Sequence, residues 1–482
     1  MIYPMHIDGE WYSGSESALK DVINPATGEV LGQIPLGTRE DAGRAVEAAH
    51  RASKQLARMT VFERAELCAR IADAVERNQE KLARLLAMEN GKTYSDALGE
   101  VKGAVAGSFR EAAEQIKWMN DAIIPLRDRN MRSYTYRKPR GVYGIISPWN
   151  FPLGNPSVYY LAPGLAAGNA IVWVPALTSA AVASEFMRVL EEAELPKGAL
   201  NLVIGEGPVV GDAVVVHDRT NAIGFTGSTP TGNTIAARAK GKPCLLELGG
   251  NGPTIVLEDA DLDLAAAALV RASFANAGQV CTSTERVLVH DGIADLLVSK
   301  IAERTAEVKL GDPFDGATTM GPVHTSQVAD KVLSQTKDAV AKGAKLIAGG
   351  KAQEGRPTGQ YIEPTILDHV TVDADINVEE TFGPVLPILR FKDESELPAL
   401  IASSPFRLAA AIFSKNVDKA MMMAEQMDFG YININEGSNY WDTMIPAGGA
   451  SGSASGVGRS GGKWSIEEMT ELRTVNVRFS GV

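Results

Sequence analysis

The sequence predicts an α/β protein built from two α/β units, and three observations support this fold class. Short apolar runs alternate with helical patterns between residues 142 and 239, and the same alternation starts again after Gly250. The stretch from Gly141 to Ser184 contains no charged residue but carries repeated prolines and glycines. These residues would break a membrane-spanning helix, so the stretch is predicted to be a buried core of strands, short helices and turns.

The N-terminal part of the chain is predicted to be helical. Residues 39–88 are rich in Ala, Glu, Arg and Leu with apolar residues at helical spacing, which predicts two or more amphipathic helices. Asn90-Gly91 is a stop signal, and a further helix is expected from about Ser95 to about Asn120. Residues 133–139 then alternate polar and aromatic side chains, which predicts an exposed strand.

The two α/β units follow in order. In the first, strands are expected at Val142–Ile146, Ala170–Val174, Leu200–Ile204 and Ala222–Phe225, and helices at Ser179–Ala193 and Gly232–Ala239. In the second, helices are expected at Asp261–Ala275, Ile293–Val308, His324–Ala341 and Asn416–Met427, and strands at Arg286–His290, Leu346–Ala348 and Leu386–Phe391. Strand–helix alternation favours parallel sheets. The tail, Leu472–Phe479, alternates again and could pair as an edge strand with another element or subunit.

Size and charge limit the possible functions. A chain of 482 residues can hold two or three domains, and a net charge of −12 argues against nucleic-acid or anionic-membrane partners. The three cysteines, Cys68, Cys244 and Cys281, are too sparse for a disulfide framework and lack metal-ligand spacing. No metal is expected, no secretory signal is visible, and a reducing, cytoplasmic compartment is predicted.

Cys281 is the predicted nucleophile. Its neighbours are small or polar, which fits a tight exposed bend better than a packed core. A thiol can attack an electrophilic carbon, and a carboxylate such as Glu247 can activate the water that later hydrolyses a thioester. Glu247 could instead pair with a buried cation, and a distant histidine could still serve Cys281 in a papain-like dyad.

Three further segments could complete a site. Gly224–Gly232 predicts a strand that ends in a glycine turn before a helix, where the backbone can approach a phosphate. Asn150 follows a predicted strand and could donate to an oxyanion. Glu380 precedes a tight turn and could accept two ribose hydroxyls. Each segment also fits ordinary turn chemistry.

Taken together and in this order, these segments resemble the aldehyde dehydrogenase superfamily. The motifs are Pro148-Trp149-Asn150-Phe151-Pro152, Phe225-Thr226-Gly227-Ser228, Leu246-Glu247-Leu248-Gly249-Gly250, Asn276-Ala277-Gly278-Gln279-Val280-Cys281 and Glu380-Thr381-Phe382-Gly383-Pro384. Asn24–Glu29 and Ser455–Arg459 are also similar to that family. Each motif is weak alone, but the ordered set is specific and covers essentially the whole chain.

The resemblance implies an NAD(P)-dependent, acid-forming enzyme that acts on a small-molecule aldehyde. It implies a Rossmann-type cofactor domain (residues 1–120 and 141–249), a second α/β catalytic domain (250–450) and a small β oligomerisation flap (121–140 and 451–482). A homodimer or homotetramer is expected. Cys281 would attack the aldehyde, Asn150 and the Cys281 backbone N–H would hold the oxyanion, and Glu247 would activate water. The cofactor-binding residues would be Trp149, Gly227, Ser228 and Gly232 on the phosphate side, with Glu380 on the nicotinamide ribose and Phe382 against the ring.

The chain departs from the family at the adenosine end of the cofactor site. The usual Lys-Pro-Ser/Ala-Glu run is here Val174-Pro175-Ala176-Leu177, so Val174 and Leu177 replace the lysine and the glutamate that hold the adenosine ribose. Losing the glutamate removes a repulsion against a 2′-phosphate, but losing the lysine removes an attraction. NAD is predicted, with NADP possible.

Further departures concern the substrate tunnel. The family's Pro-Phe-Gly-Gly is here Pro446-Ala447-Gly448-Gly449, and one extra residue is expected between Asn150 and Asn169. Trp441 should align with a remaining tunnel aromatic. These changes fit either drift in a loop or a pocket widened for a bulkier aldehyde, such as an aromatic one.

Three alternatives remain at this point. A CoA-acylating dehydrogenase would not need Glu247, and a cofactor-independent thiol hydrolase or esterase would not need the turn at Gly227 or the segment at Glu380. A non-catalytic member of the fold is suggested by Val174 and Leu177, but such a protein would have no reason to keep Cys281.

Overall fold

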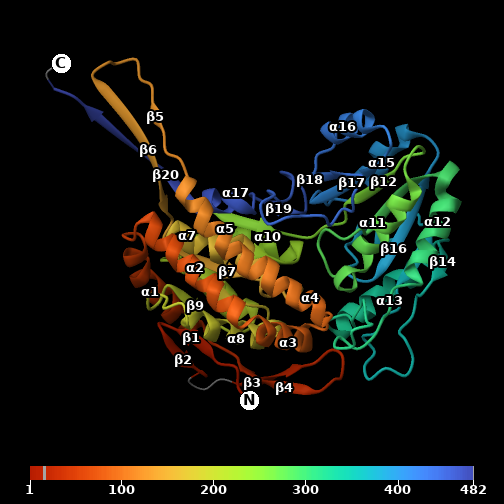
Figure 1. Ribbon diagram of the computed structural model, residues 1–482, viewed down its shortest axis with the longest axis horizontal. Helices are drawn as coiled ribbons and strands as arrows, with labels where there is room; N and C mark the ends of the chain where they lie inside the picture. The colour runs from red at the N-terminus through yellow and green to blue at the C-terminus, as the bar shows by residue number, and fades with distance from the viewer. Residues whose placement is uncertain (15–17, 481–482) are drawn as a thin grey trace.

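The chain folds into two α/β lobes and a long β-arm that carries the C-terminal end away from the body (Figure 1). The computed structural model describes residues 1–14 and 18–480. The predicted α/β class with two units is confirmed, and the C-terminal residues 481–482 of the predicted flap lie outside the described residues.

The first lobe is built on an eight-stranded sheet in the order β19-β11-β10-β7-β8-β9-β1-β2. Its strands are β1 (Met5–Ile7), β2 (Glu10–Tyr12), β7 (Val142–Ile146), β8 (Ala170–Val174), β9 (Leu200–Leu202), β10 (Ala222–Thr226), β11 (Cys244–Glu247) and β19 (Gly456–Val457). The five strands from β11 to β9 are parallel, as the alternating pattern predicts. β9 ends two residues before its predicted limit, and β11 has no counterpart among the predicted strands.

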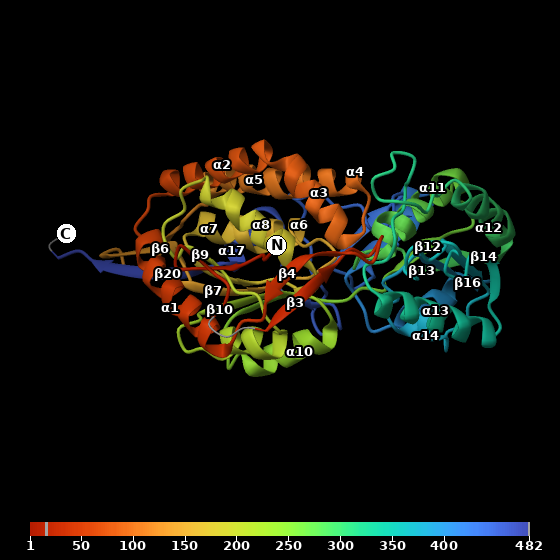
Figure 2. The same cartoon turned by 90° about the horizontal axis from the view of Figure 1, so that it is seen from below.

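Helices cover both faces of this sheet (Figure 2). They are α1 (Arg39–Leu56), α2 (Val61–Arg77), α3 (Gln79–Asn90), α4 (Tyr94–Gly99), the π-helical η1 (Glu100–Ala106), α5 (Gly107–Gln115), η2 (Ile116–Trp118), η4 (Leu177–Ser179), α8 (Ala180–Glu191), η5 (Gly207–Gly211), α9 (Asp212–Val216), α10 (Thr229–Arg238) and α17 (Gly462–Glu468). The predicted helices are confirmed, and Gly91 ends α3 in a left-handed conformation with φ of 91°. α10 starts at Thr229 rather than at the predicted Gly232, because the turn after β10 is shorter than expected.

The uncharged stretch forms the core beneath these helices. After β7 it continues through α6 (Gly154–Pro156), the π-helical turn η3 (Ser157–Leu161) and α7 (Ala162–Ala167) before β8. A π-helical turn holds an additional residue, which fits the extra residue expected in this segment. No helix in the described part of the chain is long and apolar enough to cross a membrane.

The second lobe holds a seven-stranded sheet in the order β14-β15-β16-β13-β12-β17-β18, parallel except for β14. The strands are β12 (Pro253–Val256), β13 (Arg286–His290), β14 (Lys345–Ala348), β15 (Thr365–Asp368), β16 (Val385–Phe391), β17 (Ala409–Phe413) and β18 (Tyr431–Ile434). The helices are α11 (Leu262–Phe274), η6 (Ala275–Gly278), α12 (Asp291–Thr305), α13 (Ser326–Ala341), α14 (Asp375–Val378), η7 (Glu394–Glu396), α15 (Leu397–Ala402) and α16 (Val417–Glu425). All predicted elements of this unit are present within a few residues, and β12, β15, β17 and β18 are additional.

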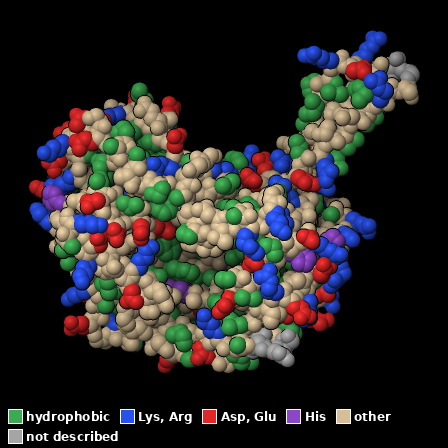
Figure 3. Space-filling model, turned by 180° about the vertical axis from the view of Figure 1, so that it is seen from behind, with side chains coloured by type: hydrophobic (Ala, Val, Ile, Leu, Met, Phe, Trp, Pro, Cys, Tyr) green, Lys and Arg blue, Asp and Glu red, His purple; other side chains and the backbone are tan. Residues whose placement is uncertain are grey.

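Two small sheets complete the fold. In one of them, β3 (Leu19–Ile23) pairs with β4 (Val30–Pro35). In the arm, β6 (Met131–Pro139) pairs with β20 (Thr470–Arg478) along nine residues and with β5 (Ile123–Ile124) on its other side. Hydrophobic side chains lie along the projecting arm in Figure 3. The pairing joins the predicted exposed strand to the C-terminal tail, whereas β19 within residues 451–482 joins the first lobe. The domain boundaries and the oligomeric state stay predictions.

Candidate active site

One cavity of about 810 Å³ lies between the lobes and gathers almost all of the predicted site residues. Its lining includes Cys281, Glu247, Asn150, Trp149, Gly227, Ser228, Glu380, Phe382, Val174 and Leu177. These residues come from segments far apart in the chain, so the fold alone brings them together.

Cys281 is presented by a bend with unusual backbone geometry. The bend lies in η6, directly after α11. There Asn276, Ala277 and Gly278 have positive φ values of 49°, 55° and 73°. A Cβ on Gly278 would lie 2.0 Å from the Gly383 carbonyl oxygen, so only glycine fits there. The bend predicted from small and polar neighbours is therefore real, and Cys281 is partly exposed to the cavity. Burial and the carboxylates of Glu380 and Glu247 raise the pKa of its thiol.

Glu247 is the last residue of β11 and is 4% exposed. Burial raises the pKa of its carboxyl to about 7, although a hydrogen bond from Ser460 and the charge of Arg459 act in the opposite direction. Ser460 Oγ donates to Glu247 Oε1 over 2.7 Å. A carboxylate with a pKa near 7 can accept a proton from water at neutral pH and later release it. Nothing near Glu247 in the sequence indicated Ser460.

Removing the Ser460 hydroxyl should shift the pH dependence of the step that Glu247 serves. The hydroxyl stabilises the carboxylate form, so Ser460→Ala should raise the Glu247 pKa further. A hydrogen bond to a charged group contributes about 1.5 kcal/mol, which corresponds to roughly 1 pH unit. In a plot of the deacylation rate against pH, measured in single-turnover experiments, the rising limb should move to higher pH.

Ser455→Ala is the matched control for this shift. The Ser455 hydroxyl is also buried in the C-terminal segment but donates to the Gly249 carbonyl over 2.7 Å, so its loss should leave the limb in place. An unchanged profile in Ser460→Ala would contradict the assignment of the limb to Glu247.

Asn150 follows β7 and points its amide at the cysteine bend. Its Nδ2 donates one N–H to the Gln279 carbonyl over 2.9 Å, two residues before Cys281. The second N–H of the amide is free of this bond. An amide held in this way can donate to an oxygen that becomes negatively charged beside Cys281.

The N-terminus of α10 faces the cavity. Ser228 is the N-cap residue, no side chain caps the helix, and Gly227 and Ser228 line the cavity. Free N–H groups at a helix N-terminus suit a pyrophosphate. Gly232 is not among the lining residues: a Cβ there would lie 2.3 Å from Leu248 Cδ2, so this glycine allows α10 to pack closely against Leu248.

Glu380 and Phe382 lie in a turn on the opposite side of the cavity. Glu380 Oε1 accepts from the Gly250 N–H over 2.9 Å, and burial raises the pKa of its carboxyl to about 7. Phe382 has φ of 58° and meets Trp149 edge-on at 5.3 Å between ring centroids. The buried Glu285 accepts from the Thr381 and Phe382 N–H groups at 2.6 and 2.8 Å, which holds this strained turn. Glu285 was not among the predicted residues.

The two ends of the cavity are largely uncharged. Val174 and Leu177 line the cavity at one end, and Lys331 is the only lysine or arginine among the described lining residues. Its ammonium donates to the Glu380 carbonyl oxygen over 2.6 Å. At the other end, Tyr159 from η3 meets Trp441 edge-on at 5.5 Å, beside Ala447 and Tyr431. Trp441 is therefore a cavity aromatic, as expected, and Tyr431 was not predicted.

A thiol, a buried carboxylate and a donor amide thus meet beside a helix N-terminus that suits a dinucleotide. This combination is typical of a dehydrogenase that oxidises a carbonyl compound. The model of the aldehyde dehydrogenase family matches residues 11–475, and the chain belongs to that family.

Similar proteins cover the chain almost completely. Lactaldehyde dehydrogenase of Methanocaldococcus jannaschii is 37% identical over 475 residues, which are 98% of this chain and 99% of that protein. The crystal structure of an E. coli NADP-dependent enzyme has a TM-score of 0.95 and 33% identity, covering 99% of this chain and 98% of that one. Betaine aldehyde dehydrogenase from Staphylococcus aureus, in complex with NAD+, has a TM-score of 0.94 and 32% identity, covering 99% and 95%. The chain is an NAD(P)-dependent aldehyde dehydrogenase.

Proposed function

We propose that this enzyme oxidises a bulky aldehyde to the free carboxylic acid through a covalent intermediate on Cys281. The observation that carries the proposal is the shared cavity of Cys281 and Glu247, where burial brings the pKa of the carboxyl to about 7. A group with this pKa serves well as a general base at neutral pH.

The chain's own groups have a role in each proposed step. The Cys281 thiol releases its proton to solvent, and its sulfur attacks the aldehyde carbon, while Glu247 in the same cavity stays free to act as a base later. The Asn150 amide and the Cys281 backbone N–H donate to the developing oxyanion. When bound, NAD(P)+ would accept the hydride that leaves the thiohemiacetal carbon, so that a thioester to Cys281 remains. Glu247 then deprotonates water, which attacks the thioester carbon, and the acid leaves as Cys281 regains a proton.

Three different features of the site argue against the three alternatives. A CoA-acylating enzyme has no use for a deacylating base beside the cysteine. A cofactor-independent hydrolase has no use for the uncapped α10 N-terminus or for Glu380 in the cavity. A non-catalytic relative would not need the Asn150 amide directed at the cysteine bend.

The substrate end favours a bulky, neutral aldehyde, such as an aromatic one. Its walls include Val158, Tyr159, Tyr431 and Trp441, and Ala447 leaves the space that the family's phenylalanine would fill. Stacked or edge-on aromatic contacts suit an aromatic ring. Lys331 lies beside Glu380 rather than here, so a distal carboxylate would find no lysine or arginine among the described residues that line this end.

NAD is the proposed cofactor, with NADP also accepted. Val174 and Leu177 offer neither a positive charge for a 2′-phosphate nor a carboxylate against one. The pyrophosphate and nicotinamide sides keep Ser228 and Glu380, which both cofactors share.

A substrate panel tests this proposal. Aromatic aldehydes such as benzaldehyde should give kcat/KM values at least roughly tenfold above those of succinic semialdehyde. One apolar group gained or lost in a hydrophobic pocket changes the free energy of binding by about 1–3 kcal/mol. Ala447→Phe should lower kcat/KM for the aromatic aldehydes and leave that for acetaldehyde within a few-fold.

The panel is run with NAD and with NADP, and the product is identified as acid or, with CoA added, as acyl-CoA. Preference for the semialdehyde would contradict the substrate proposal. Formation of acyl-CoA would contradict the acid-forming chemistry.

A further inference from the structure

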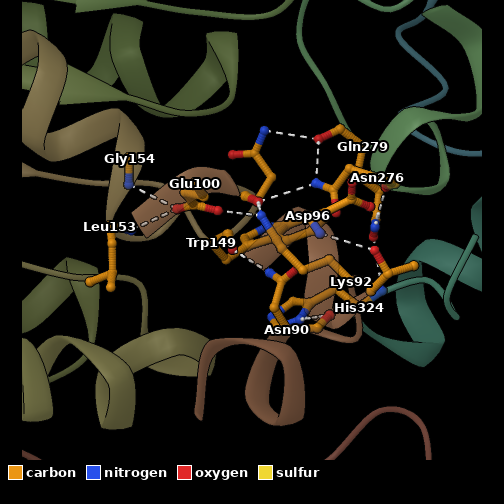
Figure 4. A network of polar contacts seen from close by, with 12 residues as sticks. Asn90, Lys92, Asp96, Glu100, Trp149, Leu153, Gly154, Asn276, Gln279 and His324 are labelled. Atoms are coloured by element: carbon orange, nitrogen blue, oxygen red, sulfur yellow. Dashed lines mark hydrogen bonds and ion pairs between the residues drawn. The ribbon is translucent and has the colours of Figure 1, made fainter. Parts of the chain in front are cut away.

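A buried ion pair outside the cavity lies directly behind Asn150. The side chains of Lys92 and Glu100 are 1% and 2% exposed, and Lys92 Nζ lies 2.5 Å from Glu100 Oε2. A buried pair of charges is costly to desolvate, so it persists only where further hydrogen bonds satisfy both groups. Here those bonds go to the segment that carries Asn150 (Figure 4).

Each partner of the pair holds a different part of that segment. Lys92 Nζ donates to the Asn150 carbonyl oxygen over 2.9 Å and lies 4.1 Å from the Phe151 ring centroid. Glu100 Oε1 accepts from the Leu153 and Gly154 N–H groups at 3.1 and 2.8 Å. The backbone is therefore fixed at Asn150 itself and three and four residues beyond it.

The same network reaches the cysteine bend. Asn276 Nδ2 also donates to the Asn150 carbonyl oxygen over 3.1 Å, and Gln279 Nε2 donates to the Asn276 carbonyl over 2.8 Å. The His324 N–H donates to Gln279 Oε1 over 2.8 Å, and the His324 ring contacts the Asn90 carbonyl over 3.2 Å. The Asn150 carbonyl oxygen thus accepts from Lys92 in the first lobe and from Asn276 in the cysteine bend of the second lobe, and Figure 4 shows these two side chains.

We propose that Lys92 and Glu100 are positioning residues that hold the Asn150 amide in register with Cys281. The inference rests on the proposed role of Asn150 as an oxyanion donor. Donors in such a site must be held in place before the charge develops, and a misplacement of about 1 Å can cost roughly 100-fold in rate. Neither Lys92 nor Glu100 lines the cavity, so neither touches the substrate or the cofactor.

A double-mutant cycle with Asn150 tests the proposal. The variant Lys92→Met/Glu100→Gln removes both charges together and leaves no unpaired buried ion. It should lower the single-turnover rate of reduced-nucleotide formation roughly 10- to 100-fold, while the dissociation constant for NAD, measured by protein fluorescence, stays within threefold. In an Asn150→Ala background the same two changes should have almost no further effect on that rate.

Glu89→Gln is the matched control. Glu89 is also fully buried and also accepts from two successive backbone N–H groups, those of Ala181 and Val182 at 2.9 and 2.7 Å, but it holds α8. Its loss should lower thermal stability without changing the rate. If the double variant does not fold, Glu100→Gln is measured alone. Glutamine keeps one oxygen that can accept from both N–H groups but removes the charged partner of Lys92, so the rate loss should be smaller.

The outcomes separate the two claims. If Asn150→Ala kept the full rate, Asn150 would not be an oxyanion donor, and the positioning role of Lys92 and Glu100 would be overturned as well. If Asn150→Ala lost activity while the pair variants kept theirs, or if the losses were additive, only the positioning role would be overturned. An equal rate loss in Glu89→Gln would also overturn it, because any buried carboxylate would then have the same effect.

Discussion

Cys281→Ala is expected to abolish aldehyde oxidation. The variant has no sulfur to attack the aldehyde carbon, and loss of a covalent nucleophile lowers kcat by roughly 10⁴-fold or more. Nucleotide binding should persist, because the α10 N-terminus and Glu380 are untouched. The measurements are reduced-nucleotide formation by absorbance and nucleotide affinity by protein fluorescence.

Cys244→Ala provides the control for this result. Cys244 is also partly exposed, but it is the first residue of β11, its thiol lies 3.4 Å from the Lys242 carbonyl oxygen, and it does not line the cavity. The variant should keep full activity, as should Cys68→Ala, because the Cys68 side chain is fully buried and does not line the cavity. Residual turnover in Cys281→Ala above a few thousandths of the wild-type rate would mean that another group forms the adduct.

Glu247→Gln is expected to separate the two halves of the reaction. Glutamine cannot take a proton from water, so one equivalent of reduced nucleotide per site should form rapidly and later turnovers should slow roughly 10²- to 10⁴-fold. The stalled enzyme should carry the acyl group on Cys281, which mass spectrometry of the intact chain would detect.

Glu111→Gln is the matched carboxylate for comparison. Burial also raises the pKa of Glu111, but its carboxylate accepts from the Thr443 hydroxyl over 2.6 Å and does not line the active-site cavity. That variant should turn over normally. Normal turnover in Glu247→Gln itself would show that another group activates the water.

The parts of the site that could be predicted share a local signal. The bend before Cys281 was readable from Asn276, Gly278 and Gln279, because tight turns need small and polar residues in consecutive positions. The turn at Gly227 and the amide at Asn150 each follow an apolar strand, which is a pattern of adjacent residues. The strands β7 and β8 were predicted to the residue for the same reason.

Other groups had no such signal. Ser460 reaches Glu247 across 213 residues of sequence, and Lys92 reaches Asn150 across 58. The sequence around Glu285 does not distinguish it from other charged residues. Its role is visible only in the structure, where it accepts from the Phe382 N–H. Gly232 was predicted to be a phosphate-binding glycine from the spacing of glycines in the turn. That spacing does not show which glycine packs against a neighbouring side chain, as Gly232 does against Leu248.

The sequence by itself determined the chemical inventory of this protein: a thiol on a bend, a carboxylate ending an apolar run, an amide after a strand, and the uncharged Val174 and Leu177 after another strand. These are properties of neighbouring residues, and short-range sterics and hydrogen bonding dictate them. The tertiary structure alone decided how those groups behave. It set the Glu247 pKa near 7, held Asn150 between two lobes and opened the cavity beside Tyr159 and Trp441, because burial, charge proximity and hydrogen-bond partners depend on segments that meet only when the chain folds.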